Sequence, residues 1–371
     1  MLLDSISDSY GSSRICELVL ESIRSQGVSV RCYVGEERRD AGRYAEELRM
    51  PLLVMSYLRK RPIGYVLETL RASLRILKRH RALFGESELV YCNTLATLPM
   101  ALLARLCGRR ALVHLHETSA SPWMRRVGGL VLRRLAHRTI CVSDAVARSW
   151  GLEAHPRSSV VRNGIPERTP GSAEPHAPTA MAYDVCFVGR LSAKKGIGTL
   201  LDALERMRSA PSGVVDRPLR VGIAGGVVPG SALPAALGAW SNGGGVEVEY
   251  LGELPATDEV FERSRIACVP STFADPYPTV VLEALRAGCV VVASEIGGAK
   301  EALEGAAAEL VPPVDAAALA DALSRQLGSW KPEAAERNRM VFSQRHTYRS
   351  FQRRFAAVPE IASLKSGGGS S

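Results

Sequence analysis

The second half of the chain alternates short apolar segments with helical segments, and this alternation restricts the possible folds more than any other feature of the sequence. Apolar strands are predicted at residues 183–188, 219–224, 246–251, 266–269 and 289–294, and helices at residues 196–207 and 278–287. The second helix has Pro278 in its first turn and Gly288 just past its end, as helices often do. Apolar strands separated by helices are typical of a parallel sheet that helices cover on both faces. The sequence therefore predicts a doubly wound α/β domain.

The first half follows the same rhythm less plainly. A helix is predicted at residues 13–25, and strands at residues 1–6, 28–34, 89–92, 111–115 and 139–142. Residues 166–178 are rich in Pro, Gly, Ser and Ala, which predicts a linker, and residues 366–371 predict a flexible tail. We therefore expect an α/β fold of two Rossmann-like, doubly wound domains that face each other across a cleft, at residues 1–165 and 179–340.

The composition describes a globular protein, because 46% of the 371 residues are hydrophobic and 23% are charged. No apolar run reaches the ~18 residues of a membrane-spanning helix, and the first residues lack the basic and apolar regions of a signal peptide. The eight cysteines are scattered singly without a C-x-x-C pair, which signals neither a zinc site nor a disulfide framework. We therefore expect a cytoplasmic protein.

Positive charge is concentrated in the first half of the chain. Residues 1–175 carry 27 Lys and Arg against 17 Asp and Glu, whereas the remaining residues carry 20 against 21. Such a field attracts nucleic acid, an anionic membrane or a phosphorylated substrate. No nucleic-acid-binding module is recognisable, so we expect no nucleic-acid partner. The basic stretch at residues 65–84 has apolar residues at helical spacing. It is either an ordinary amphipathic helix that covers the sheet or a helix that contacts anionic lipids at the inner face of the membrane.

A basic loop follows the predicted strand at residues 183–188. The strand ends at Gly189, Arg190 follows at once, and Lys195 lies just before the next helix. A guanidinium can bind two phosphate oxygens through its planar fork, and an ammonium acts as a point charge. The pattern fits a diphosphate-binding loop at the carboxyl edge of the sheet, where ligands bind in such folds. A solvated basic loop is the alternative.

Two carboxylates lie eight residues apart around the start of the helix at residues 278–287. Asp275 precedes the helix, and Glu283 lies within it among apolar neighbours. A carboxylate in such surroundings lowers stability unless it has partners. Ribose hydroxyls would serve as such partners, so Glu283 is a candidate for binding a nucleoside.

The backbone near these carboxylates offers two further features. Pro278 has no N–H, and the amides that remain at the helix start for a phosphate are those of Tyr277, Thr279 and Val280. Gly297-Gly298 follows the strand at residues 289–294. The two glycines either allow a ligand to approach the backbone closely or form a tight strand-to-helix turn.

Together these motifs resemble family 4 of the retaining GT-B glycosyltransferases. The resemblance rests on Gly189-Arg190-Leu191, Lys195-Gly196, the double glycine at residues 225–226, the pair Asp275 and Glu283, and Gly297-Gly298, over residues 180–305. The first half is similar more loosely, through Gly11-Ser12, His116-Glu117, Cys141-Val142-Ser143 and the segment at residues 160–165.

The resemblance implies a role for each matching residue. Arg190 and Lys195 would hold the donor diphosphate and neutralise the leaving group, Asp275 and His116 would contact the donor sugar, and Glu283 would bind the ribose. The implied donor-binding set also contains Gly11, Ser12, Asn163, Gly225, Leu254, Tyr277, Thr279 and Val280. The resemblance further implies that no metal or other cofactor is required, because two cations stabilise the leaving group. No D-x-D triplet occurs in the chain. The family also implies a C-terminal helix, at residues 341–365, that packs back on the first domain.

Three features depart from the family pattern or allow another interpretation. Asp275 stands where the family has glutamate and reaches about 1.5 Å less far from the backbone. The first strand is short, and the expected Gly-rich loop is reduced to residues 9–14. His114 and His116 alternate along one strand and point to the same face, which would also suit a metal or a structural role.

The sequence therefore predicts a retaining, metal-independent glycosyltransferase of the hexosyltransferase class, active in glycan or polysaccharide biosynthesis. It would move a sugar from a nucleotide-diphosphate donor to a saccharide, lipid-linked or small-molecule acceptor. A sugar-nucleotide epimerase or phosphorylase of the same fold, and a nucleotide-sugar-binding protein without turnover, are the alternatives. The sequence argues against a dehydrogenase, because no G-x-G-x-x-G follows a first strand.

Overall fold

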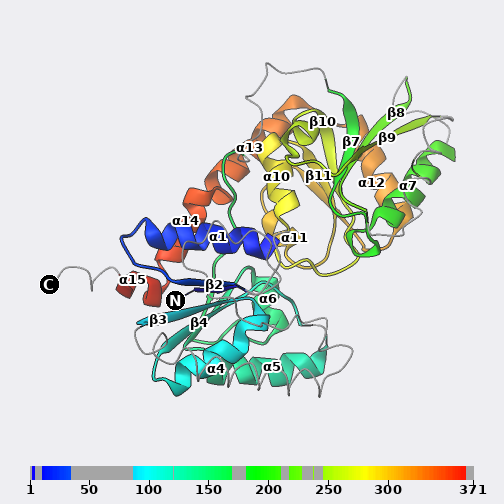
Figure 1. The fold of residues 1–371 in the computed structure, drawn as a ribbon. Helices are drawn as coiled ribbons and strands as arrows, with labels where there is room; N and C mark the ends of the chain where they lie inside the picture. Colours follow the sequence, from blue (N-terminus) through cyan, green and yellow to red (C-terminus); the bar gives the residue numbers. More distant parts are fainter. Residues whose placement is uncertain are drawn as a thin grey trace. The chain divides into compact units, whose positions relative to one another are not determined.

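The computed structural model describes residues 2–4, 11–34, 87–119, 121–168, 181–209, 217–227, 237 and 245–364 (Figure 1). The chain forms two compact units, the first from residues 1–163 and 351–371 and the second from residues 164–350. Each unit contains one six-stranded sheet, and the strands of each sheet pair in parallel. The predicted fold class of two doubly wound α/β domains is therefore confirmed.

The sheet of unit 1 has the order β2-β1-β3-β4-β5-β6. In chain order its strands are Leu2–Asp4, Cys32–Val34, Leu89–Asn93, Arg110–Leu115, Arg138–Cys141 and Ser158–Val160. In the described residues its helices before β6 are α1 (Gly11–Arg24), the short η2 (Leu95–Thr97), α4 (Leu98–Leu106), α5 (Pro122–Leu135) and α6 (Asp144–Ser149). The chain runs outward from β1 to β2 and then returns to the other side of β1 for β3. The strand order thus reverses between β1 and β3, where doubly wound folds bind ligands.

The sheet of unit 2 has the order β12-β11-β10-β7-β8-β9. In chain order its strands are Tyr183–Val188, Leu219–Ala224, Val246–Gly252, Ser264–Val269, Val290–Ser294 and Ala308–Val311. The helices that the structure describes here are η3 (Ala193–Lys195), α7 (Ile197–Ser209), α9 (Asp258–Glu262), α10 (Thr279–Ala287), α11 (Ala299–Ala302), α12 (Ala316–Gly328) and α13 (Pro332–Arg345). Here the order reverses between β7 and β10, so the loops that follow these two strands flank the expected ligand site.

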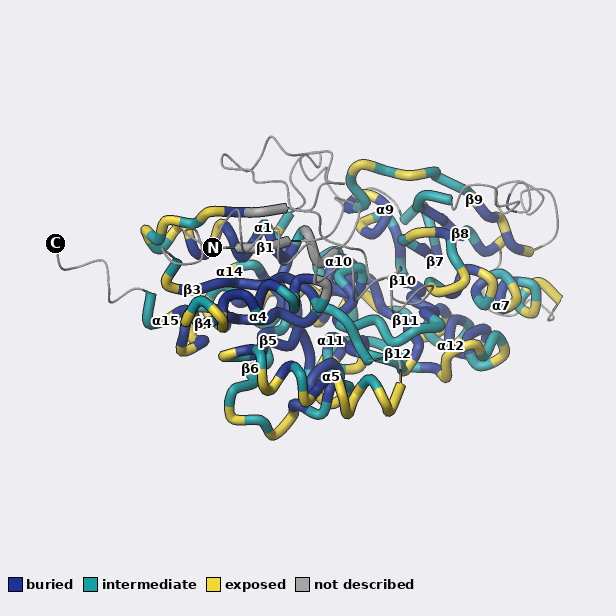
Figure 2. Tube along the Cα trace, turned by 60° about the horizontal axis from the view of Figure 1, so that its bottom comes forward, coloured by how far each residue is buried: buried dark blue, intermediate teal, exposed yellow. Residues whose placement is uncertain are grey.

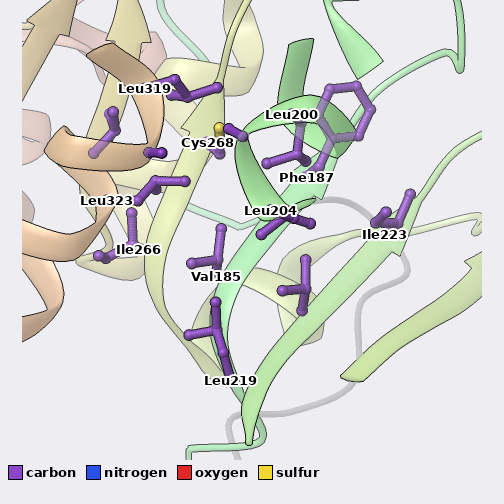
Figure 3. Packing of buried hydrophobic residues seen from close by; sticks show 14 of the residues in the cluster. Val185, Phe187, Leu200, Leu204, Leu219, Ile223, Ile266, Cys268, Leu319 and Leu323 are labelled. Carbon is purple, nitrogen blue, oxygen red and sulfur yellow. The ribbon is translucent and has the colours of Figure 1, made fainter. Parts of the chain in front are cut away.

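The core of unit 2 forms because apolar strand residues meet the apolar stripes of two helices. Figure 3 shows Leu200 and Leu204 of α7 and Leu319 and Leu323 of α12 packed against strand residues such as Val185. These side chains are almost fully removed from solvent. Each fully buried leucine or valine stabilises the fold by about 1.5–3 kcal/mol relative to an exposed one. The packing holds the strand ends, and therefore the loops after them, in fixed positions.

The C-terminal segment returns to unit 1. It contains α14 (Tyr348–Ala356) and α15 (Pro359–Leu364). The ring of Phe355 packs edge-on against Tyr91 with 6.0 Å between centroids, and Glu360 Oε2 lies 2.5 Å from Arg138 Nε. The sequence predicted that the segment at residues 341–365 packs on the first domain. In the structure, the part that belongs to unit 1 begins at residue 351, because the preceding helix α13 packs on α10 of unit 2.

Several predicted segments differ from the observed ones or lie outside the described residues. The strand predicted at residues 28–34 is paired only over Cys32–Val34. The basic stretch at residues 65–84, most of the linker and the C-terminal tail lie outside the described residues. No helix in the described parts of the chain combines the length and the apolar character needed to cross a bilayer.

Candidate functional site

An ion pair joins the two loops that flank the strand reversal of unit 2. Lys195 follows β7 and Asp275 follows β10, and the Lys195 Nζ lies 2.7 Å from Asp275 Oδ2. The Lys195 side chain keeps 32% of its surface exposed, whereas Asp275 keeps 14%. Arg190 is exposed in the same loop as Lys195. One predicted diphosphate-binding cation, Lys195, thus contacts the predicted sugar-binding carboxylate at the carboxyl edge of the sheet, and Arg190 lies in the loop that carries Lys195.

The backbone ties the same two loops together. Thr272 N–H donates to Lys194 O at 2.9 Å, and Thr272 Oγ1 donates to Ala193 O at 2.9 Å. Gly196 has φ +77°, and a Cβ at this position would lie 1.7 Å from the carbonyl oxygen of Pro270. Only glycine fits such a close approach in the left-handed region. The cations after β7 therefore sit on a loop that the segment after β10 holds in place.

Helix α10 begins directly after Asp275 and presents its positive end there. Pro278 is the N-cap residue, with extended backbone, and Thr279 is the first helical residue. The amides of Thr279 and Val280 have no acceptor within the helix, because the first N–H groups of any helix lack one. Such a helix end favours an anion. The side chain of Tyr277 is buried, with its hydroxyl 3.3 Å from His346 Nδ1.

Two glycine pairs allow the loops of the site to pack closely. Gly298 N–H donates to Asp275 O at 2.8 Å, and a Cβ on Gly298 would lie 2.1 Å from Pro276 O. A Cβ on Gly225, at the end of β8, would lie 2.0 Å from Gly189 O. Gly298 and Gly225 therefore each allow two loops to come into contact. For Gly297-Gly298 this matches the tight-turn interpretation of the sequence.

Glu283 lies on α10 with 9% of its surface exposed, as its apolar neighbours predict. Its Oε2 accepts a hydrogen bond of 3.4 Å from Thr257 Oγ1. No motif in the sequence marks Thr257. Leu254 is half-buried in the loop between β9 and α9. The protein itself supplies Glu283 with a hydroxyl partner of the kind that the ribose was expected to supply.

Unit 1 holds a second set of predicted residues at the carboxyl ends of β3 and β4. His116 Nε2 lies 3.0 Å from Asn93 Oδ1, and His114 Nδ1 bonds to the Tyr91 hydroxyl. The two imidazole rings face the same side, as their alternation predicts, with 4.2 Å between centroids. In the described ranges, no further His, Cys, Asp or Glu joins them in a cluster that could hold a metal ion.

Both histidines are neutral at physiological pH. Burial lowers the pKa of His116 to about 3, and it lowers the pKa of His114 well below 6.5, with the nearby His116 adding to the effect. Since Asn93 Oδ1 can only accept, His116 Nε2 carries the proton, and Nδ1 is left as an acceptor. Nδ1 of the neutral imidazole can therefore accept a hydrogen bond from the hydroxyl of a sugar.

Two residues near His116, Asn93 and Thr94, belong to no motif of the sequence, whereas Glu117 forms the pair His116-Glu117 of the resemblance. Asn93 orients the imidazole, Thr94 adopts φ 69° and ψ 162°, and Glu117 accepts hydrogen bonds from the amides of Leu95 and His116 at 3.1–3.3 Å. A β-branched residue in that backbone region costs about 1–3 kcal/mol, and such strain concentrates at functional sites. The signal in the sequence was the polar pair Asn93-Thr94 directly after an apolar strand.

The remaining predicted residues of unit 1 lie at helix and unit ends. Gly11 and Ser12 are the first residues of α1, whereas the loop at residues 5–10 lies outside the described residues. Asn163 is 5% exposed, and its Oδ1 accepts no hydrogen bond within the described part of the chain. A buried amide oxygen without a donor is costly. The roles expected for these three residues stay predictions.

The low pKa of His116 predicts acid sensitivity. Between about pH 6.5 and about pH 3 the unfolded chain binds a proton at this residue that the folded chain does not. Stability therefore rises with pH through this window and falls on acidification. We expect thermal unfolding from pH 7 to pH 5 to show a shallower loss of stability in His116→Gln than in the wild type. His137→Gln, an exposed histidine of the same unit, is the control, and equal slopes for the wild type and His116→Gln would contradict the prediction.

Two family models match this chain. Residues 182–329 match the family model for glycosyl transferases group 1, and residues 10–168 match the model for Glycosyltransferase Family 4. Together the two models match well over half of the chain. The boundary between them lies in the segment that the sequence marks as a linker.

Individual curated relatives share about 30% identity with about half of this chain. A phosphatidyl-myo-inositol mannosyltransferase of Mycobacterium leprae is 29% identical over 208 residues, which is 54% of this chain and 50% of the relative. A glycogen synthase of Mycobacterium tuberculosis is 31% identical over 51% of this chain and 44% of the relative. The chain spans about half the length of the curated relatives it matches.

Solved structures match over nearly the whole chain. HepE of Anabaena in complex with UDP has a TM-score of 0.72 at 20% identity, over 98% of this chain and 99% of that one. The sucrose-phosphate synthase of Thermosynechococcus elongatus has a TM-score of 0.73 at 18% identity, over 99% of each chain. At these identities the likeness shows that the fold is shared.

Proposed function

The chain belongs to the group 1 glycosyltransferases of family 4, and on that premise we propose that it transfers a sugar from a nucleotide-diphosphate donor to an acceptor with retention of the anomeric configuration. One observation carries the donor assignment. Lys195 and Asp275 pair at 2.7 Å across the strand reversal of unit 2, beside the exposed Arg190 and the start of α10. Two cations and a helix N-terminus at such a position suit a diphosphate.

In the proposed reaction Arg190 and Lys195 bind the diphosphate and offset the negative charge that grows on it as the glycosidic bond breaks. Asp275 holds the Lys195 ammonium in place, and Lys195 keeps two further N–H groups for phosphate oxygens. The amides of Thr279 and Val280 face the same anion. These groups are in position before the bond breaks, so they need no reorganisation during the reaction. No metal takes part in the proposal, because the two cations supply the positive charge.

The other donor contacts are assigned by the chemistry of each group. Glu283 accepts hydrogen bonds from the ribose hydroxyls. In unit 1, the neutral His116 accepts a hydrogen bond from a hydroxyl of the donor sugar through Nδ1. The proposed donor is a nucleotide-sugar, and the likeness of the fold to HepE, solved with UDP and with UDP-glucose, supports that class. The acceptor is proposed to be a saccharide, a lipid-linked sugar or a small molecule.

Thermal unfolding with a panel of nucleoside diphosphates and nucleotide-sugars tests the donor site. A ligand at ~100 times its dissociation constant adds about 2.7 kcal/mol of stability. We expect one nucleotide series to raise the unfolding temperature of the wild type, and the shift to disappear in Arg190→Ala and Glu283→Ala. Arg206→Ala, which removes an exposed arginine at the end of α7, is the control and should keep the shift.

Two further outcomes separate the proposal from its alternatives. A nucleotide shift without cleavage of any donor, with or without acceptors, would indicate a binding protein without turnover. Conversion of the donor sugar to its epimer without an acceptor would indicate an epimerase. No shift with any nucleotide, from a folded sample, would overturn the donor site itself. The configuration of the new glycosidic bond, measured by NMR on the product, tests retention.

A further inference from the structure

Helix α5 of unit 1 turns three large apolar side chains toward solvent, whereas its Leu132 is buried. Trp123, Val127 and Leu130 are 70%, 41% and 52% exposed. Their spacing of four and three residues places them in one stripe along the helix. Figure 2 colours long stretches of α5 as exposed. The apolar stripe of a surface helix normally faces the core. In α5, three apolar side chains form a second stripe that faces solvent, apart from the buried Leu132.

The inner face of α5 explains why the stripe cannot turn inward. Gly128 and Gly129 lie on that face, against the buried Trp150. A Cβ on Gly128 would lie 2.5 Å from the Trp150 ring, and one on Gly129 would lie 2.3 Å from Trp150 O. The two glycines weaken the helix, but they let it lie flush on unit 1. Rotation of the helix would force larger residues into this contact, so the outward direction of the apolar stripe is built into the packing.

The charge of α5 has one sign. The helix contains four arginines and no acidic residue. Arg125 pairs with Glu153 at 3.4 Å, and Arg133 bonds to the carbonyl oxygen of Gly151. Arg126 and Arg134 are exposed three and four residues from members of the apolar stripe, and no acidic residue of the described ranges pairs with them. The surface thus offers apolar side chains flanked by two arginines.

We propose that α5 docks unit 1 on the surface of an anionic lipid bilayer. Trp123, Val127 and Leu130 enter the boundary between headgroups and acyl chains, and Arg126 and Arg134 bind lipid phosphates. Interfacial helices have this composition, with tryptophan favoured at the level of the headgroups. A second copy of the chain fits less well, because two α5 helices packed together would bring their arginines face to face. The proposal goes beyond the donor chemistry and does not depend on it.

Vesicle sedimentation of the full chain, without nucleotide, tests this docking. We expect binding to vesicles of phosphatidylcholine mixed with phosphatidylglycerol, weaker binding to phosphatidylcholine alone, and a loss of binding as salt screens the arginines. Each arginine that is removed should weaken binding about fivefold, the equivalent of ~1 kcal/mol. Arg126→Gln/Arg134→Gln should therefore bind roughly 25-fold more weakly. Trp123→Ser/Leu130→Ser should lose binding to both vesicles. A blue shift of the fluorescence on binding should disappear in Trp123→Phe.

Matched controls change exposed residues elsewhere. Met340→Ser on α13 removes an apolar side chain that is 57% exposed, and Arg349→Gln removes an exposed arginine of α14. Both should bind vesicles as the wild type does. All variants change exposed residues, and their unfolding temperatures verify the fold.

Three results would overturn the proposal. These are no binding to either vesicle, binding that the α5 variants leave unchanged, or a dimer in light scattering that Trp123→Ser/Leu130→Ser converts to monomer. None of them bears on the nucleotide test, because this assay contains no nucleotide.

Discussion

Replacement of Lys195 by alanine is expected to lower kcat by about 10²–10³-fold, which is the effect of removing one preorganised group that stabilises charge in a transition state. The ammonium lies where the diphosphate leaves, and Asp275 holds it there at 2.7 Å. Steady-state release of nucleoside diphosphate from the donor measures the effect. The matched control is Lys194→Ala, since Lys194 is the exposed neighbour of Lys195 in η3.

A double variant tests whether Asp275 acts only by holding Lys195 or also contacts the donor sugar. If Asp275 acts mainly by holding Lys195, the double variant Lys195→Ala/Asp275→Ala should be no slower than Lys195→Ala, because groups that act as a unit are not additive. If Asp275 also contacts the donor sugar, the double variant should be slower. Equal losses in Lys194→Ala and Lys195→Ala would contradict the assignment, since they would point to the charge of the loop rather than to the placed ammonium.

Replacement of Gly196 by alanine should destabilise unit 2 by about 3 kcal/mol, as the sum of a left-handed backbone for a residue with a Cβ and a clash with fixed backbone. The added Cβ would lie 1.7 Å from the carbonyl oxygen of Pro270, which cannot move aside as a side chain can. Thermal unfolding should show a fall of roughly 10 °C for a unit of this size. The variant should also bind nucleotide more weakly, because the same clash pushes apart the loops that carry Lys195 and Asp275.

The chain offers a close control two residues further on. Gly198 lies in the first turn of α7, and a Cβ there would meet no atom within 4 Å. Gly198→Ala should therefore keep or slightly raise the stability of the wild type. If the two variants unfold at the same temperature, the loop after β7 does not lie against Pro270 in solution.

The strands of unit 2 were predictable because each is an almost continuous apolar run. The strand expected at residues 183–188 is β7, residue for residue, and the helix expected to end before Gly288 does so, with this glycine at φ 92°. Unit 1 was harder. The strand expected at residues 28–34 is paired only from Cys32 on, since the alternating sequence Val28-Ser29-Val30-Arg31 does not reveal where pairing begins.

For helix α5, the sequence pattern does not predict which face is buried. Its apolar residues fall at helical spacing, so the pattern by itself would place Trp123 and Leu130 in the core. The structure places Gly128 and Gly129 there instead, because Trp150 fills the space that side chains on these two residues would need. Which face of an amphipathic helix is buried depends on a neighbour that follows it in the chain.

The sequence by itself determined the two α/β domains, the family and most of the residues proposed to bind the donor, because local periodicity and short motifs carry this information. The tertiary structure alone decided that Lys195 and Asp275, 80 residues apart, form one ion pair, and that Asn93 holds the ring of His116. Each pairing joins residues at the carboxyl ends of two different strands or in the loops that follow them. Only the order of strands in the sheet brings those loops together, and that order arises from the packing of the whole domain rather than from any segment of it.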